Sequence, residues 1–581
     1  MQDFREESSG GVHTIQHNCR YGGAVGSYKL NAIPRSYFGL GIGFSYGRRT
    51  VEQRHLAELI ETTVASEWLK MLHAGNGGEI RLDMLKHREE SDTVEEATSR
   101  KCEGQLSSMK ANSCSSCILP NRTIEMEQED NNSCWNNLPS VILQEIFSYL
   151  PHENRIKASQ VCKNWRYALF HPSFWRKITF VLKDEDSISW ARFLADCFGL
   201  SVHEATIRCD IACHIVETSH LLKKLSCNRQ LRKLFLEYSS SIFECPNWYM
   251  ESETDSPTNS TSLMKSIVKI IETSNCLEAL SLGYIEELAT NANIILEPLL
   301  LHHAKHLTHL SLASVKDDPD HYDFIELEEY IFKSFIRLTV LTVDYDVVND
   351  ALLRALDSGT METIVIHVHG WHNDYLGTSN AAWEYFVQKN PKCELRLNLI
   401  HSYIGVKVLD TEILRPSMPL THLKVLFCEK FNTEVLHRLS NWYPHTLKSL
   451  IWIDSMDTTV NTPATDDPNE PDSPDPLVFV AWKCTKLVEM VFIGHKYYKE
   501  NLLAIARLRG STLKLLVFAE SDIASDSESW HKTETITHEI QEIMGKHWAP
   551  LRNTELPTVV LNPFAGDSRE VIMPLILRDE K

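Results

Sequence analysis

One short apolar pattern recurs through most of this 581-residue chain and constrains its fold more than any other feature. Each copy reads apolar-x-x-apolar-x-apolar, a spacing typical of a short buried strand. Nine copies occur, and the commonest distances between their starts are 23 to 31 residues. They begin at Leu231, Leu277, Leu307, Leu338, Met361, Leu420, Leu447, Leu487 and Leu513. A recurrence of this length predicts stacked structural repeats.

Helical patterns lie between the copies, for example at 263–271, 294–303 and 434–439. A short strand followed by a helix at this period is typical of leucine-rich repeats, whose strands line one parallel sheet. We therefore expect an α/β fold, with an irregular leucine-rich-repeat-like solenoid over residues 185–555. A further strand is expected near 395–399. The asparagine or cysteine usual at the turn of such repeats is mostly missing, so a non-repetitive α/β domain is the alternative.

Two long polar stretches separate some of the copies. Residues 239–262 and 455–476 are polar, acidic and contain prolines. Such composition predicts loops inserted between repeats. Insertions in a solenoid tend to project from one face, which is often the binding face.

The N-terminal residues 1–132 have a different composition, and we expect them to be largely disordered. Residues 76–132 are rich in Ser, Glu and Lys and carry few large apolar side chains. Such a segment cannot offset the entropy lost on ordering. Within this region, residues 51–74 have the pattern of one amphipathic helix.

The segment from Leu138 to Trp175 carries more apolar surface than a short helical unit can bury. Leu143, Phe147 and Leu150 recur at i, i+4 and i+7. A second stripe repeats this spacing one residue earlier, at Ile142, Ile146 and Tyr149. Two adjacent stripes make a wide apolar face. Part of this face must pack on the rest of the chain or on another protein.

Two prolines set the limits of the first helix. Pro139 suits a first turn because the N–H groups there have no helical partner. Pro151 ends the helix, since the residue before a proline avoids the α region. On the last long helix of the segment, one face is shared by Val161, Trp165 and Leu169.

The order of these residues resembles the F-box family. The matching order is Leu138-Pro139, Ile146-Phe147, Leu150-Pro151, Val161-Cys162-x-x-Trp165-Arg166 and Pro172-x-x-Trp175. The family docks on the Skp adaptor of cullin–RING ubiquitin ligases. The resemblance implies these adaptor-binding residues: Leu138, Pro139, Ile142, Leu143, Ile146, Leu150, Pro151, Val161, Cys162, Trp165, Leu169 and Trp175. Val141 and the Asn154-Arg155 pair depart from the family pattern, which often has an acidic residue and an aspartate–leucine pair there.

The C-terminal repeats extend the resemblance. The strings DPLVFVAWKCTKL at 475–487 and NLLAIARLRGSTLKLL at 501–516 resemble the corresponding end of a repeat-bearing F-box protein. With the F-box and the repeats, the likeness covers about 135–550.

The net charge is −20, from 58 basic and 78 acidic residues. Binding to duplex DNA or to an anionic membrane needs a clustered cationic surface. We therefore expect neither a nucleic acid nor a membrane as partner. The F-box-like segment runs against this trend, with basic residues at Arg155, Lys157, Lys163, Arg166, Arg176 and Lys177.

Fifteen cysteines occur without the spacing of a small disulfide-rich domain. This usage favours a reducing, intracellular compartment, either cytoplasm or nucleus. The sequence has neither a run of 18 apolar residues nor the pattern of a signal peptide at its start.

The sequence offers no convincing catalytic arrangement. His302, His303, His306 and His309 run from a helix into a strand, so they cannot point one way toward a metal. His367, His369 and His372 alternate like a polar strand face. The Cys114-x-x-Cys117 motif supplies one pair of zinc ligands, whereas a structural zinc site typically needs two such pairs. We expect no catalytic residue, metal or cofactor; a metalloenzyme built on the histidines is the weakest alternative.

Together these features predict a two-part adaptor. The F-box (135–180) docks on the Skp adaptor and through it on a cullin–RING ligase. The repeats (185–555), followed by a C-terminal tail (556–581), present an unidentified substrate protein for ubiquitination. The alternative is a repeat scaffold that binds the adaptor without delivering a substrate.

Overall fold

The computed structural model describes residues 138–238, 258–316, 327–372, 375, 377–456, 475–524 and 533–580. All of them belong to one compact unit, Glu58–Lys581. The predictions for residues 1–132, for the Cys114 and Cys117 pair, and for most of the two polar insertions lie outside the described residues.

The chain begins, within this part, with three short helices and a 3₁₀ turn. These are α3 (Ser140–Ser148), α4 (His152–Ser159), α5 (Lys163–Leu169) and η4 (Pro172–Trp175). Pro139 and Pro151 are the N-cap residues of α3 and α4. Each proline therefore stands directly before a helix, where the loss of its N–H leaves no helical hydrogen bond unmade.

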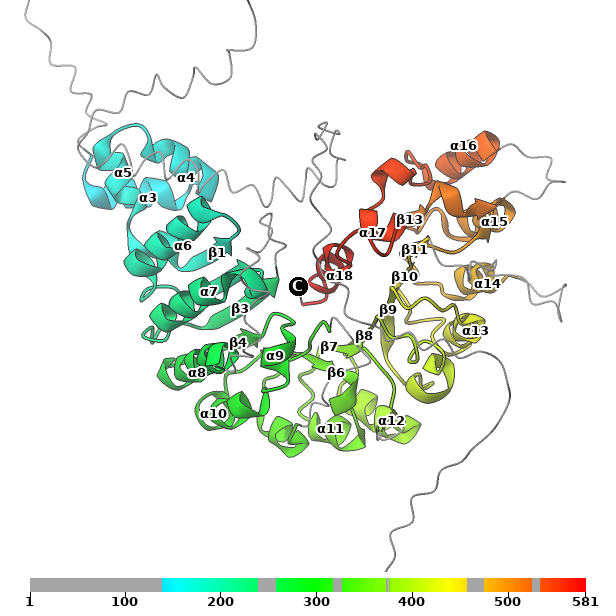
Figure 1. Ribbon diagram of the computed structural model, residues 1–581, viewed down its shortest axis with the longest axis horizontal. Helices are drawn as coiled ribbons and strands as arrows, with labels where there is room; N and C mark the ends of the chain where they lie inside the picture. Colours follow the sequence, from blue (N-terminus) through cyan, green and yellow to red (C-terminus); the bar gives the residue numbers. More distant parts are fainter. Residues whose placement is uncertain are drawn as a thin grey trace, which may run out of the picture. The chain divides into compact units, whose positions relative to one another are not determined.

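Within the described residues, twelve parallel strands follow one another in a single sheet, in the order of the chain. Figure 1 shows them in sequence, with helices along their outer side. The strands are β1 (Lys177–Leu182), β2 (Glu204–Cys209), β3 (Lys233–Tyr238), β4 (Ala279–Ser281), β5 (His309–Ser311), β6 (Val340–Asp344), β7 (Thr363–Val368), β8 (Glu394–Ile400), β9 (Leu420–Leu426), β10 (Ser449–Ile453), β11 (Glu489–Ile493) and β13 (Leu515–Phe518). The strictly sequential order confirms the repeat solenoid and excludes the non-repetitive alternative, because each strand pairs only with the strands before and after it.

Helices and short turns connect the strands. They are α6 (Glu185–Phe198), α7 (Ile211–Leu225), α8 (Thr258–Thr273), α9 (Glu286–Ala289), α10 (Asn293–His303), η6 (Glu329–Ser334), η7 (Tyr345–Val347), α11 (Asp350–Ala355), α12 (Asn380–Lys389), the π-helix η8 (Leu409–Ile413), α13 (Thr433–Trp442), α14 (Pro476–Lys483) and α15 (Lys499–Arg509). The chain then continues through η9 (Glu520–Asp522), α16 (Thr533–Met544), η10 (Asn553–Glu555), α17 (Thr558–Leu561) and α18 (Arg569–Ile576). A small second sheet pairs β12 (Tyr497–Tyr498) with β14 (Ile523–Ala524).

The prediction of a loop over residues 239–262 was wrong for its last five residues, because α8 already begins at Thr258. The residues concerned are Ser, Thr and Asn, which are as common in the first turn of a helix as in a loop. Polar composition alone does not separate the two.

The second residues of strands β3 to β6 form a continuous ladder. Leu234 pairs with Leu280, Leu280 with Leu310, and Leu310 with Leu341. Each of these side chains is fully buried between the sheet and the helices. The repeating leucine spacing is thus the spacing of one core that runs the length of the solenoid.

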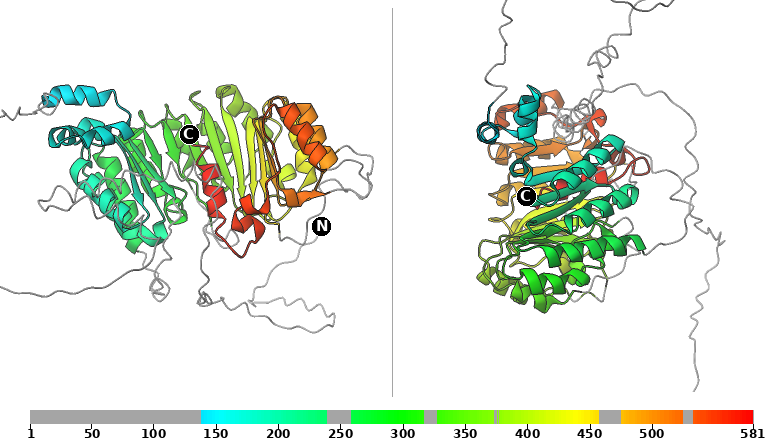
Figure 2. Two further views of the ribbon diagram at one scale, coloured as in Figure 1. Left: turned by 90° about the horizontal axis from the view of Figure 1, so that it is seen from above. Right: turned by 90° about the vertical axis from the view of Figure 1, so that its left-hand side faces the viewer.

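The other face of the sheet, which we call the inner face, is partly covered by the C-terminal segment, residues 556–580. Figure 2 shows α17 and α18 lying against the strands. A second apolar cluster joins sheet residues such as Ile451 and Ile493 to Ile572, Met573 and Ile576 of α18. The C-terminal segment is therefore packed as part of the repeat domain.

Candidate functional site

The N-terminal helices α3–α5 leave a group of large apolar side chains exposed. On α3, Val141 is 70% exposed and Ile142 48%, and Tyr149 directly after it is 77% exposed. Val161, before α5, is 60% exposed and Tyr167, on α5, is 74%. Solvent contact on this scale is unusual for so many large apolar groups in one short segment.

The opposite side of the same helices is core. Leu143, Phe147 and Leu169 are fully buried. Trp175 stacks on Phe198 of α6 with ring centroids 4.9 Å apart, and its indole N–H donates to the carbonyl of Leu169 at 2.8 Å. These contacts fix the helices to the first repeat. The apolar side chains of the helices therefore divide into one set that packs on the repeat and another set that is exposed to solvent.

Two polar side chains hold the helices together from within. The amide of Asn164 donates to the carbonyl of Leu138 at 2.8 Å. The Arg155 Nε–H donates to the carbonyl of Phe147 at 2.8 Å, and its guanidinium lies 4.9 Å from the ring centroid of Phe174. Partial burial lowers the pKa of Arg155. From the sequence, Arg155 was placed in a run of basic residues, and its structural role was missed. The last carbonyls of a helix have no helical donor, and a nearby guanidinium can supply one.

The predicted adaptor-binding residues fall into three groups in the structure. The exposed ones are Pro139, Ile142, Pro151 and Val161. The half-buried ones are Leu138, Ile146, Leu150, Cys162 and Trp165. The buried ones are Leu143, Leu169 and Trp175. The first two groups reach the solvent, whereas the buried group lies in the core behind them.

Charged and polar residues tie the C-terminal segment to the inner face. The carboxylate of Asp579 lies 2.5 Å from the ammonium of Lys424 on β9, and it accepts a hydrogen bond from Asn398 on β8 at 2.9 Å. Arg396 donates to the main-chain carbonyls of Arg578 and Asp579 at 3.2 and 2.9 Å. Burial lowers the pKa of Lys424, while Asp579 opposes that shift. The middle of the inner face is therefore already occupied by the chain itself.

Three buried side chains on this face, Asp344, His367 and His369, have possible metal-ligand atoms within 4.8 Å of one another. The carbonyl of Ser314 accepts from both imidazoles, at 3.0 and 2.9 Å, and the Ser314 N–H donates to Asp344 at 3.0 Å. The buried ammonium of Lys316 lies 3.9 Å from the carboxylate of Asp346 and helps to lower the pKa of Asp344. A second cation beside an ammonium is disfavoured, so this arrangement works as a hydrogen-bonded network within the fold.

The two groups of histidines noted in the sequence have different positions in the structure. His303 ends α10 and is buried, with Nε2 2.7 Å from the carbonyl of Ile271, whereas His309 starts β5. The first histidine group thus runs from helix to strand, as predicted. His367 lies on β7 as predicted, whereas His369 follows the strand, and both are buried in the network around Ser314. Burial lowers the pKa of His367 to about 4.

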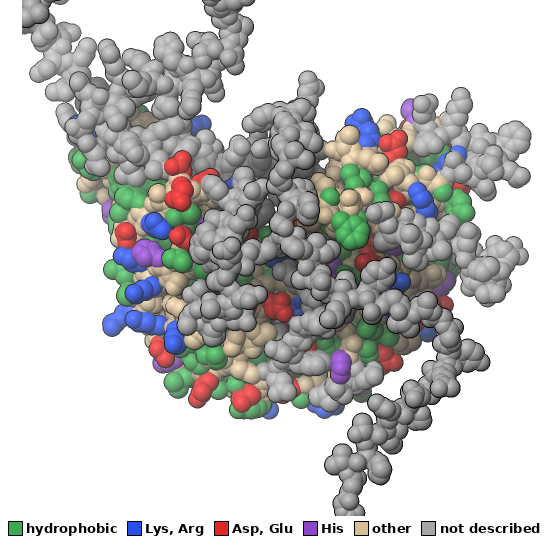
Figure 3. Space-filling view, in the orientation of Figure 1, with side chains coloured by type: hydrophobic (Ala, Val, Ile, Leu, Met, Phe, Trp, Pro, Cys, Tyr) green, Lys and Arg blue, Asp and Glu red, His purple; other side chains and the backbone are tan. Residues whose placement is uncertain are grey.

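Charged side chains are interspersed over the repeats. On the part of the surface that Figure 3 shows in colour, Lys and Arg lie among Asp and Glu side chains. Among the described helices, none has the length and apolar character needed to cross a membrane.

Comparison with known proteins agrees with the resemblance found in the sequence. Residues 135–181 match the family model described as F-box-like. F-box only protein 33 from Homo sapiens is 24% identical over 494 residues, covering 75% of this chain and 86% of the relative. The Mus musculus protein of the same name is 23% identical over 500 residues, with the same coverage.

More distant similarities follow. F-box/LRR-repeat protein 21 from Bos taurus is 22% identical over 443 residues, covering 72% of this chain and 89% of the relative. An internalin from Listeria monocytogenes aligns with 68% of this chain and 93% of its own, at 9% identity and a TM-score of 0.26. The predicted resemblance is confirmed: the chain carries an F-box-like domain and is homologous to F-box only protein 33.

Proposed function

We propose that this homologue of F-box only protein 33 is the substrate-recognition subunit of a Skp–cullin–F-box ubiquitin ligase. Its F-box and F-box/LRR relatives support an adaptor role. The observation that carries the proposal is the free apolar face of α3–α5, with Ile142 and Val161 exposed. The repeat domain anchors these helices from the other side and leaves this face open.

In this function the protein supplies position and no chemistry. The Skp adaptor binds the exposed and half-buried residues of the F-box, and the repeat domain binds the target. Tethering both to one cullin scaffold raises the effective concentration of a target lysine near the charged ubiquitin-conjugating enzyme. We accordingly assign no catalytic residue, metal or cofactor to this chain.

The occupied inner face limits where a target binds. Residues 567–580 already contact β3, β4, β8, β9 and β11 through Asp567, Arg578, Asp579 and Glu580. A target therefore meets the loops at the ends of the strands, or the exposed side of the C-terminal segment, instead of the bare sheet.

We further propose an intracellular location, in cytoplasm or nucleus, where the cullin ligase machinery works. Among the described cysteines, Cys209, Cys393, Cys428 and Cys484 are buried free thiols. Burial raises the pKa of Cys209, Cys393 and Cys484 to about 12, which keeps these thiols protonated and unreactive. A buried thiol of this kind stays reduced in an oxidising compartment too, so the proposed location rests on the F-box-like domain.

The test is capture of the purified Skp adaptor by the full chain. The double variant Leu138→Ala with Pro139→Ala is expected to lose capture while its circular dichroism stays that of the wild type. A matched control is Val216→Ala on α7, whose side chain is 66% exposed outside the F-box. Retained capture by the double variant would contradict the proposal.

The alternative is a repeat scaffold that binds the adaptor and a partner but delivers no substrate. Reconstitution with adaptor, cullin, RING protein and ubiquitin-conjugating enzyme separates the two functions. A substrate receptor transfers ubiquitin to a protein that binds the repeat domain, whereas a scaffold binds the same partner and leaves it unmodified.

A further inference from the structure

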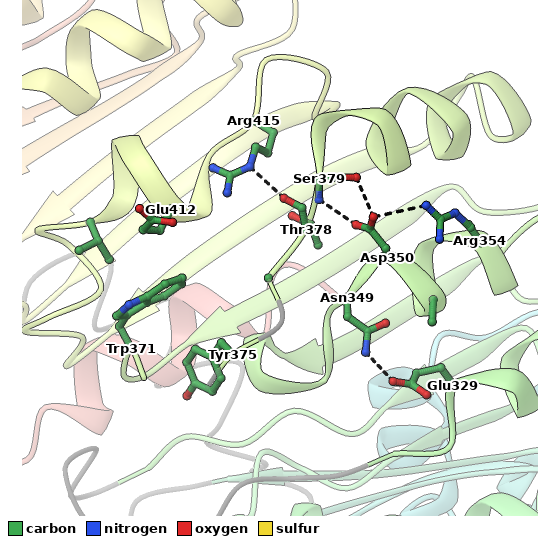
Figure 4. A pocket seen from close by; sticks show the side chains of 13 residues that line it. Glu329, Asn349, Asp350, Arg354, Trp371, Tyr375, Thr378, Ser379, Glu412 and Arg415 are labelled. Carbon is green, nitrogen blue, oxygen red and sulfur yellow. Dashed lines mark hydrogen bonds and ion pairs between the residues drawn. The ribbon is translucent and has the colours of Figure 1, made fainter. Parts of the chain in front are cut away.

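A pocket lies where the chain leaves strands β6, β7 and β8. Its volume is about 980 Å³, which is in the range of ligand-binding pockets. The segments that follow these strands supply most of its walls, through the start of α11, the residues after β7, and η8 with Arg415. Figure 4 shows their side chains converging on one space.

One side of the pocket combines aromatic rings with a carboxylate. The rings of Trp371 and Tyr375 lie edge to face, with centroids 5.6 Å apart. Figure 4 places Glu412 beside Trp371, and Arg354 at the far end. Both rings are half-buried, and Glu412 is exposed. Aromatic rings next to a carboxylate form the environment in which a cationic group binds well.

Most other charges in the pocket are already paired. Asp350 accepts from the N–H and the hydroxyl of Ser379, both at 2.7 Å, and lies 3.4 Å from Arg354. The Arg415 guanidinium donates to the main-chain carbonyls of Thr378, Thr411 and Leu414.

The remaining lining carboxylates differ in their partners. Glu329 accepts from the Asn349 amide at 2.5 Å. Among the described residues, none pairs with the carboxylate of Glu412. The lining thus has three carboxylates against two guanidiniums, and its unmatched charge is negative.

A buried hydroxyl lies behind the aromatic side. Tyr345 is 4% exposed, and its hydroxyl has no hydrogen-bond partner among the described residues. It lies 3.9 Å from the position that a Cβ on Gly377 would take, and Gly377 lines the pocket. Tyr345 therefore lies behind the lining residues and is not itself part of the pocket wall.

We propose that this pocket receives a cationic side chain, arginine or lysine, from a basic segment of the target protein; this deepens the receptor function proposed above and rests on it. The charged head contacts Glu412, and its aliphatic stem lies against Trp371 and Tyr375. The net charge of −20 favours the approach of a basic partner.

The experiment is fluorescence anisotropy with the full chain and three labelled nonapeptides. Each has glycine and serine flanks around two central arginines, two lysines or two glutamates. For the arginine peptide, Glu412→Gln and Trp371→Leu are each expected to weaken binding about five- to tenfold, as expected for one cation–carboxylate or cation–π contact.

The matched control is Glu362→Gln, an exposed glutamate that precedes β7 and so lies at the other end of that strand. It is expected to change affinity less than about twofold. Because Glu412 is exposed, its substitution tests the charge even if Trp371→Leu fails to fold.

Three results would overturn the pocket assignment. One is equal binding of basic and acidic peptides to the wild type. Another is tighter binding of the glutamate peptide, which would make Arg354 and Arg415 an anion site. The third is an equal effect of the Glu412 and Glu362 variants. Adaptor capture is measured on the same samples, so failure of the pocket and failure of the receptor function give different outcomes.

Discussion

The ammonium of Lys424 and the carboxylate of Asp579 form an ion pair at 2.5 Å with both side chains almost fully buried, at 4% and 3% exposure. Lys424 belongs to β9, whereas Asp579 stands near the end of the chain. The pair therefore joins the C-terminal segment to the middle of the solenoid.

Lys424→Ala is expected to destabilise the fold by about 3–5 kcal/mol, because it leaves a buried carboxylate without its main counter-charge. Lys448→Ala is the matched control. Lys448 also lies 2.5 Å from its partner Glu394, but these side chains are 37% and 32% exposed, so the loss is expected to stay below about 1 kcal/mol. Urea unfolding of both variants measures the difference; equal losses would contradict the burial argument.

Removal of Trp175 is expected to destabilise the fold, while removal of Val161 is not. Trp175→Ala deletes a buried ring and should cost about 3–5 kcal/mol. Val161→Ala changes an exposed side chain and should stay within about 0.5 kcal/mol, yet weaken adaptor capture. Thermal unfolding and adaptor capture measure the two effects. A loss of stability in the Val161 variant would show that this residue is part of the core.

The stability of the fold is expected to fall between pH 6.5 and pH 4 in part through His309. Burial lowers the pKa of His309 to about 4, and Lys233 adds to this while the main chain of Glu580 opposes it. An unfolded imidazole titrates near about 6.5. The unfolded chain thus binds more protons across this interval, and the contribution is complete above it and lost on acidification.

His309→Gln removes this titration, so its urea midpoint is expected to fall less between pH 7 and pH 5 than that of the wild type. The matched control is His538→Gln on α16, whose side chain is 72% exposed. A fall as large as in the wild type would exclude His309 as a source of the acid sensitivity.

Gly494 is expected to tolerate no side chain. Its φ is +92°, and a Cβ would stand 2.3 Å from the carbonyl oxygen of Asp454. Gly545 shares the positive φ, at +65°, but a Cβ there meets nothing within 4 Å. Gly545→Ala should cost about 1–2 kcal/mol, from backbone strain alone. Gly494→Ala should cost about 1–3 kcal/mol more, from the clash. Similar thermal shifts would contradict this.

The sequence predicted the repeats because each unit carries its own apolar spacing. It missed β1 and β2, although Trp175-x-x-Ile178-x-Phe180 and Val202-x-x-Ala205-x-Ile207 fit the same spacing. A tryptophan and a valine occupy the first position there, and Trp175 had already been assigned to the F-box. Trp175 belongs to both the F-box and the first repeat. A search that assigns each residue to one motif does not find a residue that two motifs share.

The position of the C-terminal segment could not be predicted in this way. Asp579 and Lys424 are 155 residues apart in sequence, and neither stands in a local pattern that indicates the other. The pocket shares this difficulty, since Trp371 and Glu412 come from different repeats. Contacts between distant units depend on how many repeats separate them and how strongly the sheet curves, and single-unit patterns do not carry that information.

A stack of repeats that touch only their neighbours behaves like a spring, because small rotations between units add up along its length. Here one stretch of chain reaches Ser281 on β4 through Glu580 and Glu489 on β11 through Arg578, with Ser281 and Glu489 lying many strands apart. Such a link between distant strands resists changes in the curvature of the sheet. Whatever the two ends of this molecule hold, it is expected to keep them at one separation.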